Sequence, residues 1–252
     1  MKYTIFSRKQ DEISLGIVKQ IKSLIKLEYD EENPDIVITV GGDGTILRAV
    51  NKYIDLVDKI TFFGVKTGHL GFYTNFTVND IVDLCEKINT NNFDCETHNL
   101  LRWESNLNSG YAINEITITN PTATQIVDVY IDENIFETVR GTGLCISTTN
   151  GSTAYNKSLN GPVVDHSLNC IILTEIASIN SNAYRSLNSP LVLSTNRRLE
   201  LKSNNAKFLT SDHLQFELDH DDYVKCYLSD KKIKFGKRCN TEFMDRIKKA
   251  FL

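Results

Sequence analysis

The segment Val40-Gly41-Gly42-Asp43-Gly44-Thr45 combines a glycine-rich loop with a carboxylate. It follows the apolar run Ile36–Val40 and precedes a helix-like segment, Ile46–Tyr53. A strand, a glycine turn and a helix in this order bring free backbone N–H groups to one point, which suits a phosphate. A carboxylate beside phosphates is unfavourable unless a metal ion bridges them or the carboxylate takes a proton from a reacting hydroxyl. The loop therefore indicates phosphoryl transfer, and the alternative is a turn that merely needs glycines.

The first hundred residues alternate between strand and helix patterns. Strands are expected at 2–6, 36–40 and 60–65, and helices at 12–27, at 46–53 and from Thr77 or Asn79 to Ile88. A short β-branched run such as 36–40 is typical of a strand that is buried on both faces. The alternation predicts a parallel sheet covered by helices.

The pattern changes after about residue 95 to short alternating runs that are separated by turn-forming residues. Such runs predict antiparallel β structure, sandwich-like or barrel-like, and only Gly151–Gly161 interrupts them with a loop that opens into a short helix. The expected fold class is therefore an α/β N-terminal domain with a parallel sheet plus an antiparallel all-β C-terminal domain. We expect the domains at 1–97 and 98–237, with a C-terminal helix at 238–252 that packs back on the first domain.

Composition excludes several classes of protein. The chain has 252 residues and a formal net charge of −4, so no basic field recruits nucleic acid or an anionic membrane. No apolar run is long enough to span a bilayer, and the N-terminus lacks the pattern of a signal peptide. The six cysteines form no C-x-x-C pair, so we expect free thiols in a reducing cytoplasm and no structural zinc site.

Five segments, in this order along the chain, resemble NAD kinases of the bacterial type. They are Gly41–Thr45, Thr67–Phe72, Asn114-Glu115, Arg140–Leu144 and Gly151–Ser158. The first segment also occurs in diacylglycerol-type lipid kinases, whereas the others are more specific. The resemblance implies an NAD kinase/diacylglycerol kinase-like fold and transfer of a phosphoryl group from ATP, or from polyphosphate, to the 2′-hydroxyl of the adenosine ribose of NAD, which gives NADP.

The resemblance also implies roles for individual residues. Asp43 would be the general base on the 2′-hydroxyl, and Gly44 would let the nucleotide approach the backbone. Asn114 and Glu115 would bind ribose hydroxyls, which a carboxylate accepts naturally. The other implied nucleotide-binding residues are Arg48, Arg140, Thr142, Thr153, Ala154, Tyr155, Asn156, Lys157, Ser158 and Ala177.

Cofactor and assembly are further expectations from the resemblance. A divalent cation, Mg²⁺ or Mn²⁺, should accompany the phosphoryl donor, and the sequence shows no dedicated protein site for it. A homodimer or homotetramer is expected, with active sites completed across subunits. Thr142 stands where the family commonly has an aspartate, a change that concerns affinity more than the class of reaction. Leu214 stands where some members have a glutamine, so that side-chain contact is not available here.

Other interpretations fit less of the sequence. A diacylglycerol-type lipid kinase would share the glycine loop, but it would not need Asn114-Glu115 or Gly151–Ser158. A non-enzymatic NAD-binding module would need the pocket but not Asp43. A Rossmann dehydrogenase is not expected, because no G-x-G-x-x-G follows the first strand. Within the family interpretation, Glu115 could still be the polar face of an edge strand, and Asp219–Asp222 is expected to be an exposed hairpin turn.

Overall fold

The chain folds into two compact units in a computed structural model, which describes residues 1–7, 12–68, 71–219, 222–238 and 243–252. The first unit holds residues 1–98 and 231–252, and the second holds residues 99–230. The sequence analysis placed the second boundary at 237 instead. The two differ because Tyr223–Gly236 is one continuous strand, whose last residues belong to the first unit.

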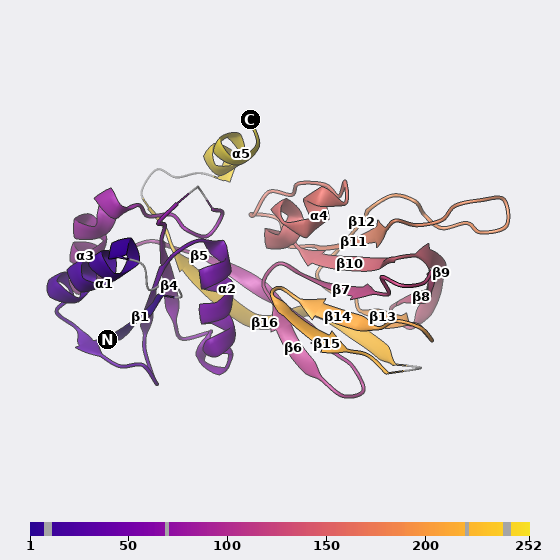
Figure 1. Cartoon of the computed structure of the whole chain (residues 1–252), viewed down its shortest axis with the longest axis horizontal. Helices are drawn as coiled ribbons and strands as arrows, with labels where there is room; N and C mark the ends of the chain where they lie inside the picture. Colours follow the sequence, from indigo (N-terminus) through magenta and orange to yellow (C-terminus); the bar gives the residue numbers. More distant parts are fainter. Residues whose placement is uncertain (8–11, 69–70, 220–221, 239–242) are drawn as a thin grey trace. The chain divides into compact units, whose positions relative to one another are not determined.

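Strands and helices alternate in the first unit, as the sequence pattern predicts. The elements are β1 (Lys2–Ser7), α1 (Glu12–Leu24), β2 (Glu28–Tyr29), β3 (Ile36–Val40), α2 (Asp43–Lys52), η1 (Ile54–Leu56), β4 (Thr61–Val65), η2 (Val78–Asp80) and α3 (Ile81–Asn89). The sheet has the order β2-β1-β3-β4, and every one of these pairs is parallel. Helices α1 and α3 cover one face of the sheet and α2 covers the other (Figure 1).

The central strand β3 shows why this arrangement is stable. All five of its residues are buried, as expected for a strand that has helices on both faces. Ile17 and Ile21 of α1 join Leu84 and Ile88 of α3 in one apolar cluster on the same side of the sheet. The carboxyl end of β3 therefore leads directly from a rigid core into the glycine loop.

The C-terminal segment also belongs to the first unit. The last residues of β16 (Tyr223–Gly236) pair in parallel with β4, Lys234 opposite Thr61 and Phe235 opposite Phe62. The terminal helix α5 spans Phe243–Phe251, within the stretch that the sequence pattern assigns to a helix.

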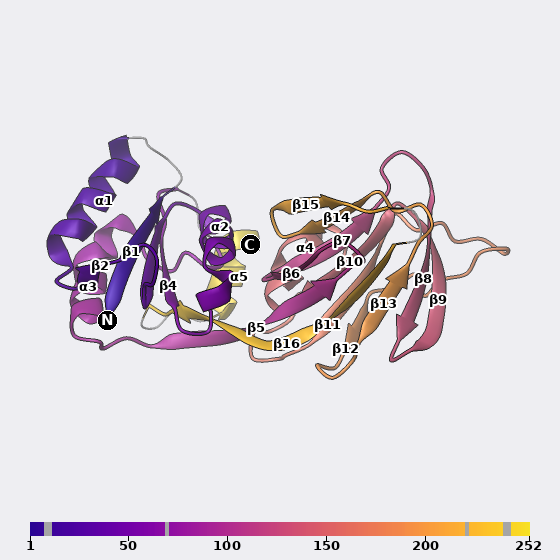
Figure 2. The same cartoon turned by 90° about the horizontal axis from the view of Figure 1, so that it is seen from below.

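The second unit consists mainly of antiparallel strands. One sheet has the order β12-β11-β10-β7-β14-β15. In the other sheet, the first part of β16 pairs with β13, which is followed by β8 and then β9. The strands are β5 (Cys95–Glu104), β6 (Ser109–Ala112), β7 (Glu115–Thr119), β8 (Gln125–Ile131), β9 (Asn134–Gly141), β10 (Gly143–Thr148), β11 (Ile171–Ile176), β12 (Leu191–Leu193), β13 (Leu199–Lys202), β14 (Phe208–Ser211) and β15 (Leu214–Glu217). Figure 2 shows the two layers, with the short segments η3 (Asn150–Thr153) and α4 (Tyr155–Ser158) inserted after β10.

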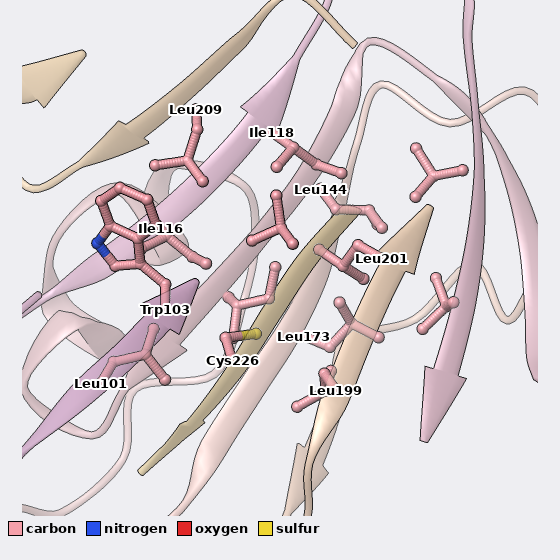
Figure 3. Packing of buried hydrophobic residues seen from close by; sticks show 14 of the residues in the cluster. Leu101, Trp103, Ile116, Ile118, Leu144, Leu173, Leu199, Leu201, Leu209 and Cys226 are labelled. Atoms are coloured by element: carbon pink, nitrogen blue, oxygen red, sulfur yellow. The ribbon is translucent and has the colours of Figure 1, made fainter. Parts of the chain in front are cut away.

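Side chains from both layers fill one apolar core. Leu144 of β10 and Leu201 of β13 come from different sheets and are both buried in it (Figure 3). Trp103 of β5 lies in the same core, and its indole N–H donates to Ser211 Oγ at 3.0 Å. This hydrogen bond satisfies the one polar group of a large buried ring. The expected fold class, a parallel α/β part and an antiparallel β part, is confirmed.

Several elements differ from the sequence-based expectation. One of the short alternating runs, Tyr111–Thr119, is divided between the end of β6 and all of β7, with a break at Ile113 and Asn114. The first long strand of the β part, β5, was missed. Among the described residues, no helix combines the length and the hydropathy needed to cross a membrane. His69, Cys239 and the first residues of the expected terminal helix lie outside the described residues.

Candidate active site

Asp43 is the first residue of α2, directly after the two glycines of the loop. Gly41 has φ +151°, and a Cβ there would lie 2.3 Å from Thr45 Oγ1, so the turn requires glycine. Gly42 is the N-cap and Gly44 lies in the first helical turn. A Cβ at Gly44 would meet no atom within 4 Å, which leaves the backbone there open to a ligand.

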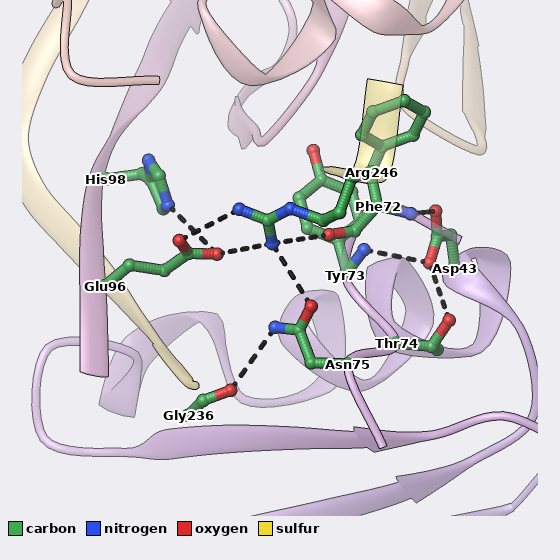
Figure 4. A network of polar contacts seen from close by, with 9 residues as sticks. All are labelled: Asp43, Phe72, Tyr73, Thr74, Asn75, Glu96, His98, Gly236 and Arg246. Carbon is green, nitrogen blue, oxygen red and sulfur yellow. Dashed lines mark hydrogen bonds and ion pairs between the residues drawn. The ribbon is translucent and has the colours of Figure 1, made fainter. Parts of the chain in front are cut away.

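The Asp43 carboxylate is held by the chain after β4 (Figure 4). The backbone N–H of Phe72 donates to Oδ2 at 2.6 Å, and that of Tyr73 donates to Oδ1 at 3.1 Å. The Thr74 hydroxyl donates to Oδ1 at 3.4 Å. The donors that fix the carboxylate therefore come from residues 72–74, outside the glycine loop itself.

Gly71 leaves the space that this carboxylate occupies. A Cβ on Gly71 would lie 2.1 Å from Asp43 Oδ1. Any larger residue would therefore displace the carboxylate from its donors. The position of the Asp43 carboxylate therefore depends on two glycines, Gly41 in the loop before α2 and Gly71 in the loop after β4.

Competing effects act on the pKa of Asp43. Burial of its carboxyl raises the pKa, and the hydrogen bonds from Phe72, Tyr73 and Thr74 lower it; the net direction is upward. With its pKa raised by burial, the Asp43 carboxylate binds a proton more strongly than an exposed aspartate does. It is suited to take a proton from a hydroxyl. Arg48, on the same helix, is partly buried.

In the second unit, Asn114 and Glu115 lie where β7 begins, and both are buried. Asp212 orients this part of the chain, because its carboxylate accepts the N–H groups of Ile113 at 2.8 Å, Asn114 at 2.8 Å and Glu115 at 3.4 Å. Asp212 is not among the site residues that the sequence predicts. Its left-handed backbone, φ +50°, is common for aspartate at tight turns.

Glu115 is a buried acid with unused hydrogen-bonding capacity. Strand β7 lies between β10 and β14, so the alternative of an edge strand is wrong. Burial and the nearby charge of Asp212 raise the pKa of Glu115 to about 8, although the backbone N–H of Tyr155 opposes this. Burial raises the pKa of Asp212 to about 6 against its three backbone donors. Glu115 Oε2 is buried and has no hydrogen-bond partner among the described residues.

The segment 150–158 packs directly against Asn114. A Cβ on Gly151 would lie 2.1 Å from the Asn114 carbonyl oxygen, so only glycine allows this approach. The Thr153 hydroxyl donates to the Asn150 carbonyl at 3.2 Å. Ala154 is partly buried and Tyr155 is exposed, as are Lys157 and Ser158. The structure thus brings the Asn114-Glu115 pair together with the start of this segment.

Asn156 differs from its expected role. Its side chain is fully buried, and its Nδ2 donates to the carbonyls of Ser152 at 3.4 Å and Pro162 at 3.1 Å. Its Oδ1 accepts the Thr174 hydroxyl at 2.8 Å. Both ends of the amide are therefore used inside the fold. We reassign Asn156 from ligand binding to holding the 152–162 loop.

Arg140, Thr142 and Ala177 form a separate group. The Thr142 N–H donates to the Ile176 carbonyl at 2.9 Å, and the guanidinium of Arg140 lies 4.2 Å from the centroid of the Tyr184 ring. Ala177 is exposed and has φ +47°. Thr142 precedes β10, whereas Glu115 pairs with Ser147 near the other end of that strand. Five residues of extended strand separate the two ends, roughly 16 Å.

Comparison with known proteins agrees over nearly the whole chain. A family model described as the ATP-NAD kinase N-terminal domain matches residues 6–93, and one described as the ATP-NAD kinase C-terminal domain matches residues 113–237. An NAD kinase of Lactobacillus johnsonii is 40% identical over 95% of this chain and 93% of its own length. An NAD kinase of Geobacillus stearothermophilus is 39% identical over 97% of this chain and 94% of its own length.

Solved structures show the same fold. The crystal structure of an NAD kinase from Archaeoglobus fulgidus in complex with ATP has a TM-score of 0.80 and 25% identity, and the match covers 99% of both chains. That of the yeast NADH kinase complexed with NADH has a TM-score of 0.85 and 20% identity, over 99% of this chain and 87% of the other.

The raised pKa of Glu115 predicts a pH-dependent stability. Between its ordinary pKa of 4.5 and its folded pKa of about 8, the unfolded chain ionises while the folded chain keeps the proton. The free energy of unfolding therefore falls as pH rises through this range. Glu115→Gln removes the loss and should raise the free energy of unfolding at pH 8 by about 3–5 kcal/mol, with little change at pH 4.5.

Urea unfolding of the wild type, Glu115→Gln and Glu217→Gln at several pH values measures this effect. Glu217 is an exposed glutamate in β15 of the same sheet and serves as the control, for which no gain is expected. Equal stability of Glu115→Gln and the wild type at pH 8 would contradict a buried, protonated Glu115.

Proposed function

This chain belongs to the ATP-NAD kinase family and is a phosphotransferase that makes NADP from NAD; we propose that Asp43 is its general base. The proposal rests on the Asp43 carboxylate at the start of α2. The backbone N–H groups of Phe72 and Tyr73 hold this carboxylate, and burial raises its pKa. Neither a lipid kinase nor a non-enzymatic binding module accounts for family matches in both parts of the chain.

The proposed reaction uses the position and basicity of Asp43. The 2′-hydroxyl of the adenosine ribose gives its proton to the Asp43 carboxylate while its oxygen attacks the terminal phosphorus of the donor. The bond to the bridging oxygen breaks, and ADP leaves when ATP is the donor. Phosphoryl transfer depends mainly on positioning and electrostatic stabilisation, and the donors from residues 72–74 supply the positioning.

A divalent cation enters this scheme with the phosphoryl donor. We propose that the cation, Mg²⁺ or Mn²⁺, binds the phosphates of the donor, where it would neutralise the charge that develops in phosphoryl transfer. The exposed backbone at Gly44 and the basic side chain of Arg48 are proposed to contact nucleotide.

The second unit is proposed to bind NAD through Asn114, Glu115 and the segment 153–158. Glu115 Oε2 is buried and lacks a partner among the described residues, and a ribose hydroxyl can accept a hydrogen bond from the protonated carboxyl or donate one to the carboxylate. Tyr155, which is exposed, would provide an aromatic wall. Of this segment, we exclude only the side chain of Asn156 from ligand contact.

The group of Arg140, Thr142 and Ala177 supports a further proposal. Thr142 lies roughly 16 Å along β10 from the position of Glu115, a large distance for two sides of a single small pocket. We propose that this group completes the NAD site of another subunit in a homodimer or homotetramer, as the family resemblance implies. Use of polyphosphate as a second donor and a cytoplasmic location remain predictions.

Removal of the divalent cation tests the charge argument. Purified protein with NAD and ATP should form NADP when Mg²⁺ or Mn²⁺ is present and should lose this activity in excess EDTA, because the phosphate charge is then not neutralised. Polyphosphate and a reaction without donor are run in parallel. Full activity in EDTA would contradict the proposed cation requirement.

Asp43→Asn tests the base. The amide keeps the shape of the carboxylate but removes its charge and its ability to take a proton, so kcat should fall by roughly 10²–10⁴-fold. NAD should still bind with similar affinity, because the proposed NAD-binding residues lie in the second unit. A coupled NADP-formation assay and calorimetric titration measure the two effects.

The control is Asp55→Asn, an exposed aspartate beyond the same helix, which should behave as wild type. Near-normal turnover of Asp43→Asn would make Asp43 a structural residue. Loss of NAD binding in this variant would instead assign Asp43 to substrate binding.

A further inference from the structure

Arg246 is a buried arginine on the short C-terminal helix α5. It is 4% exposed, whereas Met244 on the same helix is 53% exposed. A buried guanidinium is unfavourable unless hydrogen bonds and an opposite charge compensate for its loss of water. The contacts that compensate here lead directly towards Asp43 (Figure 4).

The guanidinium is held on one side by a glutamate. Nη1 donates to Glu96 Oε1 at 2.9 Å and Nη2 donates to Glu96 Oε2 at 3.1 Å. Burial opposes the ionisation of Glu96, but the hydrogen bonds and charges of His98 and Arg246 outweigh it and lower its pKa. The pair is therefore a bidentate ion pair of fixed geometry, anchored on β5.

The same Nη1 also binds the loop that holds the catalytic carboxylate, so its two hydrogens are shared among three acceptors. Nη1 donates to the Phe72 carbonyl at 3.1 Å and to Asn75 Oδ1 at 3.2 Å. The Phe72 carbonyl and the Tyr73 N–H belong to the same peptide group, and that N–H donates to Asp43 Oδ1 at 3.1 Å. One rigid, planar peptide thus accepts from Arg246 at one end and donates to Asp43 at the other.

We propose that Arg246 is a positioning residue of phosphoryl transfer, which acts by orienting the 72–73 peptide that holds Asp43. The inference rests on the proposed role of Asp43 as the base. A cation at the carbonyl end of a peptide polarises it and strengthens the hydrogen bond that its N–H donates. The same contact prevents the peptide from rotating away from the carboxylate. The terminal helix, distant in sequence, thereby controls the geometry of the base.

Arginine and lysine are not equivalent at position 246. Only a planar guanidinium can bind both oxygens of Glu96 and still reach Phe72 and Asn75. Lysine keeps the charge beside Glu96 but loses the fork. Arg246→Lys should therefore keep the ion pair and only part of the positioning.

The test compares Arg246→Met and Arg246→Lys with Arg238→Met. Arg238 lies in the same C-terminal segment, is 47% exposed and pairs with Asp80 at 2.9 Å, so its loss should not change turnover. Arg246→Met should lower kcat on the order of 10²-fold, the effect of a small misplacement of a catalytic group. KM and calorimetric Kd for NAD should stay near wild-type values. Arg246→Lys should lie between Arg246→Met and wild type.

A double variant distinguishes positioning from general destabilisation. In an Asp43→Asn background, Arg246→Met should reduce the residual kcat by less than about threefold, because two residues that act through one step are not additive. A loss of equal size in both backgrounds, or an Arg246→Met enzyme with wild-type kcat, would overturn the inference. If Arg246→Met does not fold, the same cycle with Arg246→Lys decides the question.

Failure of the inference is distinguishable from failure of the proposed function. An active Asp43→Asn enzyme would refute the base itself. An inactive Asp43→Asn enzyme together with a fully active Arg246→Met enzyme would refute only the role of Arg246.

Discussion

The contact on which the first unit depends is the pair of hydrogen bonds from the Phe72 and Tyr73 backbone N–H groups to the Asp43 carboxylate. Backbone donors cannot rotate as side chains do, so they hold an acid in one orientation while it keeps accepting capacity for a substrate. Other features follow from this contact. Strand β3 leads into α2, where Asp43 begins the helix, Gly71 leaves room for the carboxylate, and Arg246 binds the opposite end of the 72–73 peptide.

In the second unit, one carboxylate, that of Asp212, accepts backbone N–H groups as Asp43 does, and a second carboxyl group, that of Glu115, is left for ligand binding. Asp212 accepts three consecutive N–H groups and so fixes the break between β6 and β7. Glu115, at the end of that break, is raised in pKa by burial and by Asp212 and keeps one oxygen without a partner among the described residues. Asp43 is thus an acid whose carboxylate the fold satisfies with donors, whereas Glu115 keeps one oxygen without a partner among the described residues. The first suits proton transfer, and the second suits binding of a hydroxyl.

Features that depend on residues close together in the sequence were predicted, and features that depend on contacts between distant residues were not. The β3–α2 loop, the parallel sheet and the antiparallel β part follow from local periodicity, so the fold class was predictable. Arg246, 174 residues from Phe72, and Asp212, 98 residues from Asn114, act through long-range contacts that no local pattern encodes. For Asn156, in α4, the motif indicated importance, but the direction of its side chain depends on Thr174 in β11. Strand β5 was missed because its burial alternates irregularly.

The most direct test of the account moves the Asp43 carboxylate without removing it. In Gly71→Ala the new methyl group would lie only 2.1 Å from Asp43 Oδ1, so the carboxylate must move. The φ angle of Gly71 lies outside the left-handed region, so the alanine backbone is not strained there. Gly68→Ala, in the same loop, meets nothing within 4 Å and is the control. We expect Gly71→Ala to lower kcat by about 10²-fold, while its affinity for NAD and the kcat of Gly68→Ala stay near wild type. Equal turnover of the two alanine variants would contradict the claim that these backbone donors position the base.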